Sequence, residues 1–229
     1  AQALSALTEY TYAGYNKLAN TLESLADKAV NQASLSRLPN GKALYDAMIL
    51  LNTDTTMSAQ KIHQIGLDNV IRIHGEMDVI LNSVGRSEGS VSERLNAMSK
   101  DPKLVYPDTE AYKNQTLEEV RAMVAVIEEI APQYFGTLPK SALEVRRVPA
   151  FREKTSAAGY YNAPSEDGTR PGIYYINLRS TGLVPTYALP TLSYHEAVPG
   201  HHFQVALGLE QKGLPILQRV NTNTNAFAE

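Results

Sequence analysis

The segment from His195 to Gln204 constrains this chain more than any other, because it reads H-E-A-V-P-G-H-H-F-Q and holds three of the five histidines. A histidine followed at once by a glutamate opens the zinc hydrolase pattern H-E-x-x-H. In that pattern two histidines one helical turn apart bind the metal, and the glutamate activates a water. Here proline occupies position 199, where the second histidine would stand. The segment therefore predicts metal chemistry on a helix that cannot be regular.

The proline decides which histidine can be the second ligand. Pro199 has no N–H for the carbonyl group of His195, and its ring crowds that carbonyl, so the helix must bend or bulge. On an undistorted helix His202 would share a face with His195, but their backbones would be about 10 Å apart. Gly200 tolerates unusual dihedral angles, so an unwound turn can bring His201 back towards His195. We favour His201 as the second ligand and keep His202 as the alternative.

The pattern H-E-A-x-P-G-H-H-x-Q resembles the signature of the domain-of-unknown-function 885 family, a bacterial group described as zincin-like metallopeptidases. The resemblance covers most of the chain, because further stretches look like family landmarks in family order. These are Thr55-Thr56, Ile62 to Leu67, Leu138-Pro139, Val145 to Pro149 and Arg170 to Leu178. Members usually continue through a motif of the form F-x-E-G-W, and this chain stops on Phe227-Ala228-Glu229.

The resemblance implies a gluzincin-type zinc site. His195, His201 and Glu229 would hold Zn²⁺, or another divalent ion, since imidazole and carboxylate ligands suit several metals. Glu196 would act as general base on the attacking water and then pass the proton to the leaving amine. Glu210 is the nearest rival as third ligand, but on a continuing helix it lies about 22 Å along the axis from His195.

The ending on a ligand predicts that the chain is a fragment of a longer protein, truncated after the third-ligand motif. Asparagine and threonine fill positions 221–225 and are typical of helix starts, so a helix beginning there would carry Glu229 in its first turns. The remainder of the protein beyond Glu229 is then a partner of this piece. We expect the isolated 229 residues to be inactive or weakly metallated.

Other side chains offer weaker candidates for substrate binding. Tyr174 and Tyr175, or Tyr160 and Tyr161, can donate a phenol hydrogen bond to an oxyanion, although tyrosines in such stretches are commonly core or rim residues. Arg170 can bind a substrate carboxylate through two hydrogen bonds, although an arginine before Pro-Gly is usually solvated. His63 and His74 lie in a predicted helix and read as packing or surface histidines.

Periodicity predicts a mainly helical α+β fold of zincin-like type. Helices are expected through the first third, with a break at Pro39-Asn40-Gly41, and over 42–52, from Ser58 to near Gly85, and over 117–130. The apolar stripes of the later helices are read as core. Strands are expected over 143–148 and 172–178, with a turn-rich loop between them, and the second strand is the candidate for pairing with an extended substrate. We expect a helical region over 1–135 and a region of strands and the motif helix over 136–229, together one catalytic unit.

Composition limits the class of protein. A net charge of −3 without a basic run argues against nucleic acid as a partner, and no apolar run is long enough to span a membrane. The absence of cysteine removes thiolate sites and suits an oxidising compartment. With the bacterial resemblance, this favours a periplasmic or secreted location over a cytoplasmic one.

Three functions fit these observations. The first is a zinc metallopeptidase that cleaves peptide bonds. The second is a metal-dependent hydrolase of a non-peptide amide or ester, which would use the same residues. The third is a non-enzymatic helical binding protein in which the motif is a relic.

Overall fold

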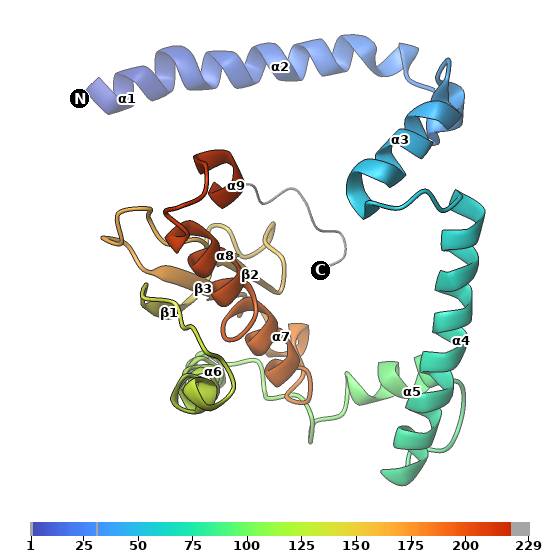
Figure 1. Ribbon diagram of the computed structural model, residues 1–229, viewed down its shortest axis with the longest axis vertical. Coiled ribbons are helices and arrows are strands. Elements are labelled where there is room, and N and C mark those ends of the chain that lie inside the picture. The colour runs from blue at the N-terminus through green and yellow to red at the C-terminus, as the bar shows by residue number, and fades with distance from the viewer. Residues whose placement is uncertain (1, 31, 221–229) are drawn as a thin grey trace. The chain divides into compact units, whose positions relative to one another are not determined.

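The computed structural model describes residues 2–30 and 32–220 and shows helices together with one small sheet (Figure 1). The α+β prediction is therefore confirmed. The chain forms two compact units, residues 1–62 and 63–229. The predicted organisation as regions 1–135 and 136–229 acting as one catalytic unit stays a prediction.

The first unit is helical. Figure 1 shows α1, η1 and α2 as one continuous rod. The elements are α1 (Gln2–Ala6), the π-helical turn η1 (Leu7–Thr11), α2 (Tyr12–Leu25), the 3₁₀ turns η2 (Ala26–Lys28) and η3 (Leu35–Arg37), and α3 (Gly41–Thr53). The predicted break before α3 is confirmed, and Asn40 adopts a left-handed conformation there, with φ of 60°.

Helix α4 (Ala59–Ser83) begins and ends close to the predicted positions. The Ser58 hydroxyl accepts a hydrogen bond of 3.2 Å from the amide of Lys61, as an N-cap does. Gly85 follows the helix with φ of 76°, a left-handed value that favours glycine. His63 and His74 lie exposed on this helix.

The prediction that the apolar stripe of α4 forms core is wrong for most of its positions. Ile73, Ile80 and Val84 expose 42%, 62% and 60% of their surface, and Leu81 is buried. The short helix α5 (Val91–Met98), which was not predicted from the sequence, meets α4 through charge instead. The buried guanidinium of Arg94 pairs with Asp78 and donates to the carbonyl of Arg86 at 3.0 Å. Polar contacts thus replace apolar packing where these two helices meet.

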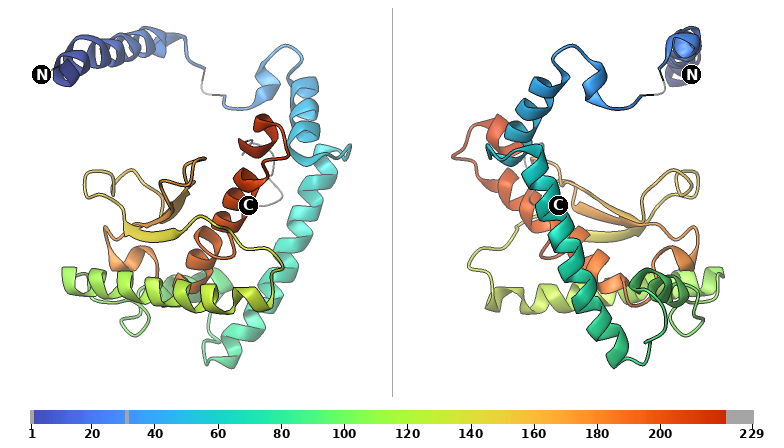
Figure 2. Two further views of the ribbon diagram at one scale, coloured as in Figure 1. Left: turned by 60° about the vertical axis from the view of Figure 1, so that its left-hand side comes forward. Right: turned by 90° about the vertical axis from the view of Figure 1, so that its right-hand side faces the viewer.

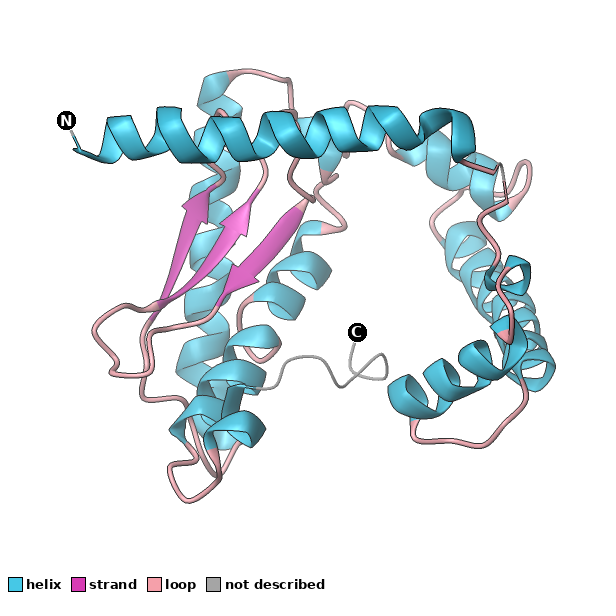
Figure 3. Cartoon of the chain, turned by 90° about the horizontal axis from the view of Figure 1, so that it is seen from above, coloured by secondary structure: helices cyan, strands magenta, loops and turns pink. Residues whose placement is uncertain are grey.

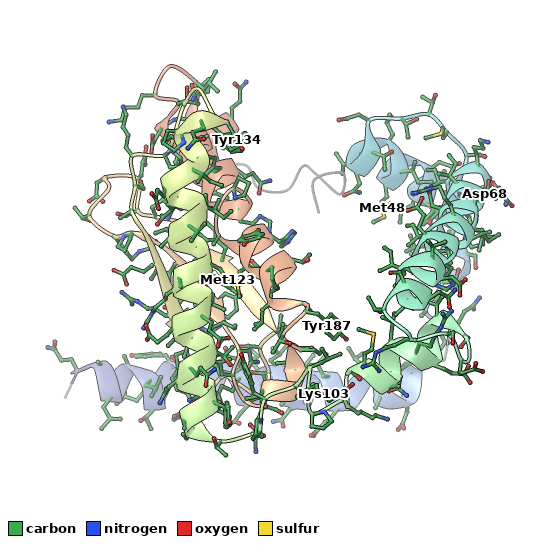
Figure 4. The ribbon with its side chains drawn as sticks, turned by 90° about the horizontal axis from the view of Figure 1, so that it is seen from below. Met48, Asp68, Lys103, Met123, Tyr134 and Tyr187 are labelled. Carbon is green, nitrogen blue, oxygen red and sulfur yellow. The ribbon has the colours of Figure 1, made fainter. Side chains whose placement is uncertain are left out.

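Helix α6 (Glu110–Ile130) provides one wall of the core of the second unit, as its apolar stripe predicted. Val120 and Val124 are buried, and Leu117, Met123 and Ile127 pack against the same cluster. Figure 4 shows the side chains of α6, with Met123 near the middle of the helix and Tyr134 beyond its end. The 3₁₀ turn η4 (Ala131–Gln133) follows directly.

The three-stranded sheet has the order β1-β3-β2, formed by β1 (Leu143–Arg147), β2 (Gly159–Asn162) and β3 (Gly172–Ile176). Strand β1 runs parallel to β3 and β2 runs antiparallel to it, so one arrow in Figure 3 points against the other two. β1 and β3 confirm the two predicted strands. β2 was missed, because a four-residue strand that starts with glycine and ends with asparagine carries little strand signal.

Strand register divides the tyrosines between the two faces of the sheet. Tyr161 lies opposite Tyr174 across β2 and β3, and Tyr160 lies opposite Tyr175. Tyr174 belongs to the apolar cluster with Val120 and Val124, so its face is the one covered by helices (Figure 2). Because side chains alternate along a strand, Tyr161 shares the covered face, and Tyr160 and Tyr175 lie on the other.

The remaining elements follow β3. They are the 3₁₀ turn η5 (Thr181–Leu183), α7 (Leu189–Glu196), α8 (His201–Glu210) and α9 (Ile216–Val220). α7 contacts both α6 and β2, which places the His-Glu pair at its end beside the sheet. No helix among the described residues is long and apolar enough to cross a membrane.

Two valines on α6 offer a matched test of this packing. Val120 is fully buried, whereas Val126 on the same helix is 55% exposed. We expect Val120→Ala to lower the free energy of unfolding by about 2 kcal/mol, because it removes two buried methyl groups and leaves a cavity. Val126→Ala should change it by less than about 0.5 kcal/mol. Urea unfolding of the two variants measures the difference, and equal effects would contradict the proposed core.

Candidate metal site

The motif folds as two short helices instead of one. α7 ends at Glu196 and α8 begins at His201, and the peptide bond between Val198 and Pro199 is cis. The amide of Gly200 donates to the carbonyl of Tyr194 at 3.0 Å, six residues back, so the turn between the helices is wider than a helical turn. The interruption predicted from the missing N–H of Pro199 is confirmed.

Gly200 is required by a close approach of the backbone to itself. A Cβ atom at this position would lie 1.8 Å from the carbonyl oxygen of His195 and 2.5 Å from that of Tyr194. No side chain can be accommodated at such distances without moving the chain. The wide turn therefore needs glycine next to proline, and it fixes where α8 starts relative to the end of α7.

The turn brings His195 and His201 together. Their ring centres are 4.6 Å apart and the ring planes meet at 74°. Two imidazoles that share a zinc ion at Zn–N distances of about 2.0–2.1 Å have ring centres about 5 Å apart, so this separation fits a shared metal. His195 is exposed and His201 is partly exposed, which leaves this side of the motif accessible.

Gln204 sets the proton on His201. The Nδ1 atom of His201 lies 2.8 Å from the Oε1 atom of Gln204, one turn further along α8. An amide oxygen only accepts, so Nδ1 carries the hydrogen and Nε2 keeps the lone pair that a metal needs. Gln204 belongs to the motif, but no role was predicted for it from the sequence. The signal was its three-residue spacing from His201.

His202, the alternative ligand, faces the other way. It is 3% exposed, with Nδ1 at 2.9 Å from the hydroxyl of Tyr161 and Nε2 at 3.0 Å from the carbonyl oxygen of Ser141. Burial lowers the pKa of His202, and the Ser141 carbonyl and the charge of Glu210 partly oppose this shift. Both ring nitrogens are thus engaged within the protein in this structure.

Glu196 is buried beside the sheet. It is 7% exposed, and its Cγ atom lies 3.4 Å from the point where a Cβ would stand on Gly159, the first residue of β2. Tyr174 adjoins the same point, with its Cε2 atom 3.1 Å away. Burial raises the pKa of Tyr174, the Ser193 hydroxyl lowers it, and the negative charge of Glu196 raises it further. Gly159 therefore makes room for the carboxylate next to the two histidines.

The three candidate substrate-binding residues do not come together. Tyr174 has no exposed surface, Tyr175 stacks on Tyr160 at 5.0 Å on the opposite face of the sheet, and Arg170 lies in an exposed loop. Their assignment to the substrate stays a prediction. The proposal that the strand 172–178 pairs with an extended substrate is wrong, because β3 is the central strand and both its edges are occupied.

The third-ligand prediction, Glu229, falls outside the described residues. Its rival Glu210 uses its carboxylate elsewhere, accepting hydrogen bonds from the backbone amides of Lys140 at 2.8 Å and Ser141 at 3.2 Å. Within residues 2–30 and 32–220 no group of three or more histidine, cysteine or acidic side chains could hold a metal. The described part of the site thus consists of the two histidines with Glu196 and Gln204.

Comparison with known proteins places the whole chain in one family. The family model described as "Bacterial protein of unknown function (DUF885)" matches residues 1–229. The solved structure titled "The crystal structure of the putative lipoprotein from Colwellia psychrerythraea" superposes with a TM-score of 0.93 and 35% sequence identity. The match covers 97% of this chain and 38% of that protein, so this chain spans well under half of its relative's length. The search of curated proteins found no match.

Two glycines test the turn. Gly200→Ala should lower the free energy of unfolding by about 1–3 kcal/mol or more, because the new methyl group overlaps the carbonyl of His195. Gly208→Ala, within α8, is the control: the nearest atom to its Cβ is the Arg219 carbonyl oxygen at 3.7 Å, an ordinary contact. It should stabilise the protein by up to about 1 kcal/mol, as alanine does in helices. Thermal and urea unfolding measure both, and a neutral Gly200→Ala would contradict the described turn.

Proposed function

The chain belongs to the DUF885 family of bacterial proteins, and from its two converging histidines we propose that it is a zinc-dependent hydrolase, most simply a metallopeptidase. The observation that carries the proposal is the 4.6 Å separation of the His195 and His201 rings across a break that only Pro199 and Gly200 allow. The hydrogen bond of His201 Nδ1 to Gln204 adds the outer-shell partner that metal-binding histidines usually have.

In the proposed site His195, His201 and Glu229 hold the metal, as in gluzincins, and the fold is of zincin-like type. When bound, zinc would polarise a substrate carbonyl and lower the pKa of a water towards about 7. The carboxylate of Glu196 would accept the proton of the attacking water. It would then pass this proton to the nitrogen of the leaving amine, so that the C–N bond breaks as the C–O bond forms. Because Glu196 is buried against β2, its carboxylate is kept from the bulk solvent.

The substrate would lie along β2 rather than β3. β2 is an edge strand of the sheet and contacts α7, the helix that carries His195 and Glu196. An extended peptide that adds to an exposed edge makes main-chain hydrogen bonds to it, which gives affinity for peptides over small esters. β1, the other edge, instead contacts α6. This arrangement favours peptide bonds as the substrate class.

The location proposed for the protein is outside the bacterial cytoplasm. The relative from Colwellia psychrerythraea is described as a lipoprotein, and it shares 35% identity with this chain. The absence of cysteine agrees with an oxidising compartment.

Replacing the base tests the proposed reaction. In the full-length protein we expect Glu196→Gln to lower kcat/KM on peptides by about 10²–10⁴-fold, because the amide cannot accept a proton. Zinc content should stay at the wild-type level. Glu129→Gln, an exposed carboxylate on α6, is the matched control and should leave hydrolysis unchanged.

Mass spectrometry of a peptide library after incubation measures cleavage directly, and an amide and ester panel run beside it identifies a non-peptide hydrolase. Undiminished hydrolysis by Glu196→Gln would overturn the role of this residue. No hydrolysis of either library by wild-type protein that contains zinc would favour the binding-protein alternative.

A further inference from the structure

Tyr161 links the sheet to the helix that carries His201. Its hydroxyl, on β2, lies 2.9 Å from the Nδ1 atom of His202 on α8, 41 residues away in the sequence. The Nε2 atom of the same imidazole lies 3.0 Å from the carbonyl oxygen of Ser141, which precedes β1. The imidazole of His202 therefore bridges two segments of the sheet region from within the core.

The hydrogens of this bridge have a determined direction. A carbonyl oxygen only accepts, so Nε2 of His202 carries a hydrogen and donates it to Ser141. In the neutral ring Nδ1 then has a lone pair and accepts from the hydroxyl of Tyr161. Phenylalanine at 161 would leave this buried nitrogen without its donor, which costs free energy in the folded state.

A second contact fastens the other end of α8 to the same segment. The carboxylate of Glu210, the last residue of α8, accepts hydrogen bonds from the amides of Lys140 and Ser141. With His202 near the first turn of α8 and Glu210 at its end, the helix is held at two points against one short stretch of backbone. Rotation of α8 about its axis would break the contact at His202.

The start of β3 is shaped to admit this pair of rings. A Cβ atom on Gly172 would lie 2.3 Å from the hydroxyl oxygen of Tyr161 and 2.7 Å from Nδ1 of His202. A side chain at 172 would displace the hydrogen bond between them. Gly172 is thus required by the Tyr161–His202 contact in the same way that Gly200 is required by the turn.

The bridge bears directly on the metal site, because His201 precedes His202 and its ring lies beside that of Tyr161. The centres of these two rings are 6.5 Å apart and their planes differ by 24°. We propose that Tyr161 is a positioning residue for the metal site, which acts through His202 to hold the His201 ring opposite His195. This inference rests on the proposed zinc hydrolase function.

The zinc dissociation constant of the full-length protein, measured by competition with a chromophoric chelator, tests this role. Tyr161→Phe should raise it about 3- to 10-fold, below the 10- to 100-fold typical of losing a direct partner of a ligand. Tyr160→Phe is the matched control on the same strand. Its hydroxyl is buried and has no hydrogen-bond partner among the described residues, so its loss should leave zinc affinity unchanged.

A double mutant separates positioning from general stability. His202→Gln keeps a donor for the Ser141 carbonyl but removes the imidazole nitrogen that accepts from Tyr161. If Tyr161 acts through His202, adding Tyr161→Phe to His202→Gln should weaken zinc binding no further. The visible spectrum of the cobalt-substituted protein should change in Tyr161→Phe and stay the same in Tyr160→Phe.

The failures of the two proposals can be told apart. Wild-type protein that binds no zinc overturns the proposed function and this inference with it. Wild-type protein that binds zinc, with Tyr161→Phe equal to it in affinity and cobalt spectrum, overturns the positioning role alone, even if the melting temperature falls. Additive effects of Tyr161→Phe and His202→Gln on zinc affinity would also overturn it, because the two residues would then act separately.

Discussion

Proline 199 and glycine 200 together set the geometry on which the rest of the candidate site depends. Proline removes an N–H that a continuous helix would need, and glycine allows the chain to pass 1.8 Å from where a Cβ would meet the carbonyl of His195. On a continuous helix the residues six and seven positions after His195 would be about 9–10 Å further along the axis. The wide turn cancels that displacement for His201, while His202 enters the core.

The short sheet completes the site by sorting side chains onto two faces. Alternation along β2 and β3 places Tyr161 and Tyr174 under the helices and Tyr160 and Tyr175 on the other face. Glycines 159 and 172 stand where the motif helices approach most closely, one against Glu196 and the other against the Tyr161–His202 pair. The motif residues are thus supported by strand residues that are far away in the sequence.

Sequence predicted the parts that depend on local chemistry. Apolar spacing identified α4 and α6, and proline at 199 predicted both the interrupted helix and the turn of His201 towards His195. It could not identify β2, whose four residues include glycine and asparagine, nor the contact of Tyr161 with His202, which joins distant segments. It also misread the apolar face of α4 as core, because periodicity shows that a face is apolar and not whether another element covers it. Glu229 lies outside the described residues and stays a prediction.

The central claim is that the turn makes His195 and His201 a pair of metal ligands. Elemental analysis of the full-length protein, purified without chelator or affinity metal, tests it most directly, with His195→Ala, His201→Ala and the exposed-histidine control His63→Ala measured beside it. We predict about one zinc per chain in the wild type and the control, and a loss of zinc in both site variants. Wild-type protein without metal, or full zinc in His201→Ala, would contradict this claim.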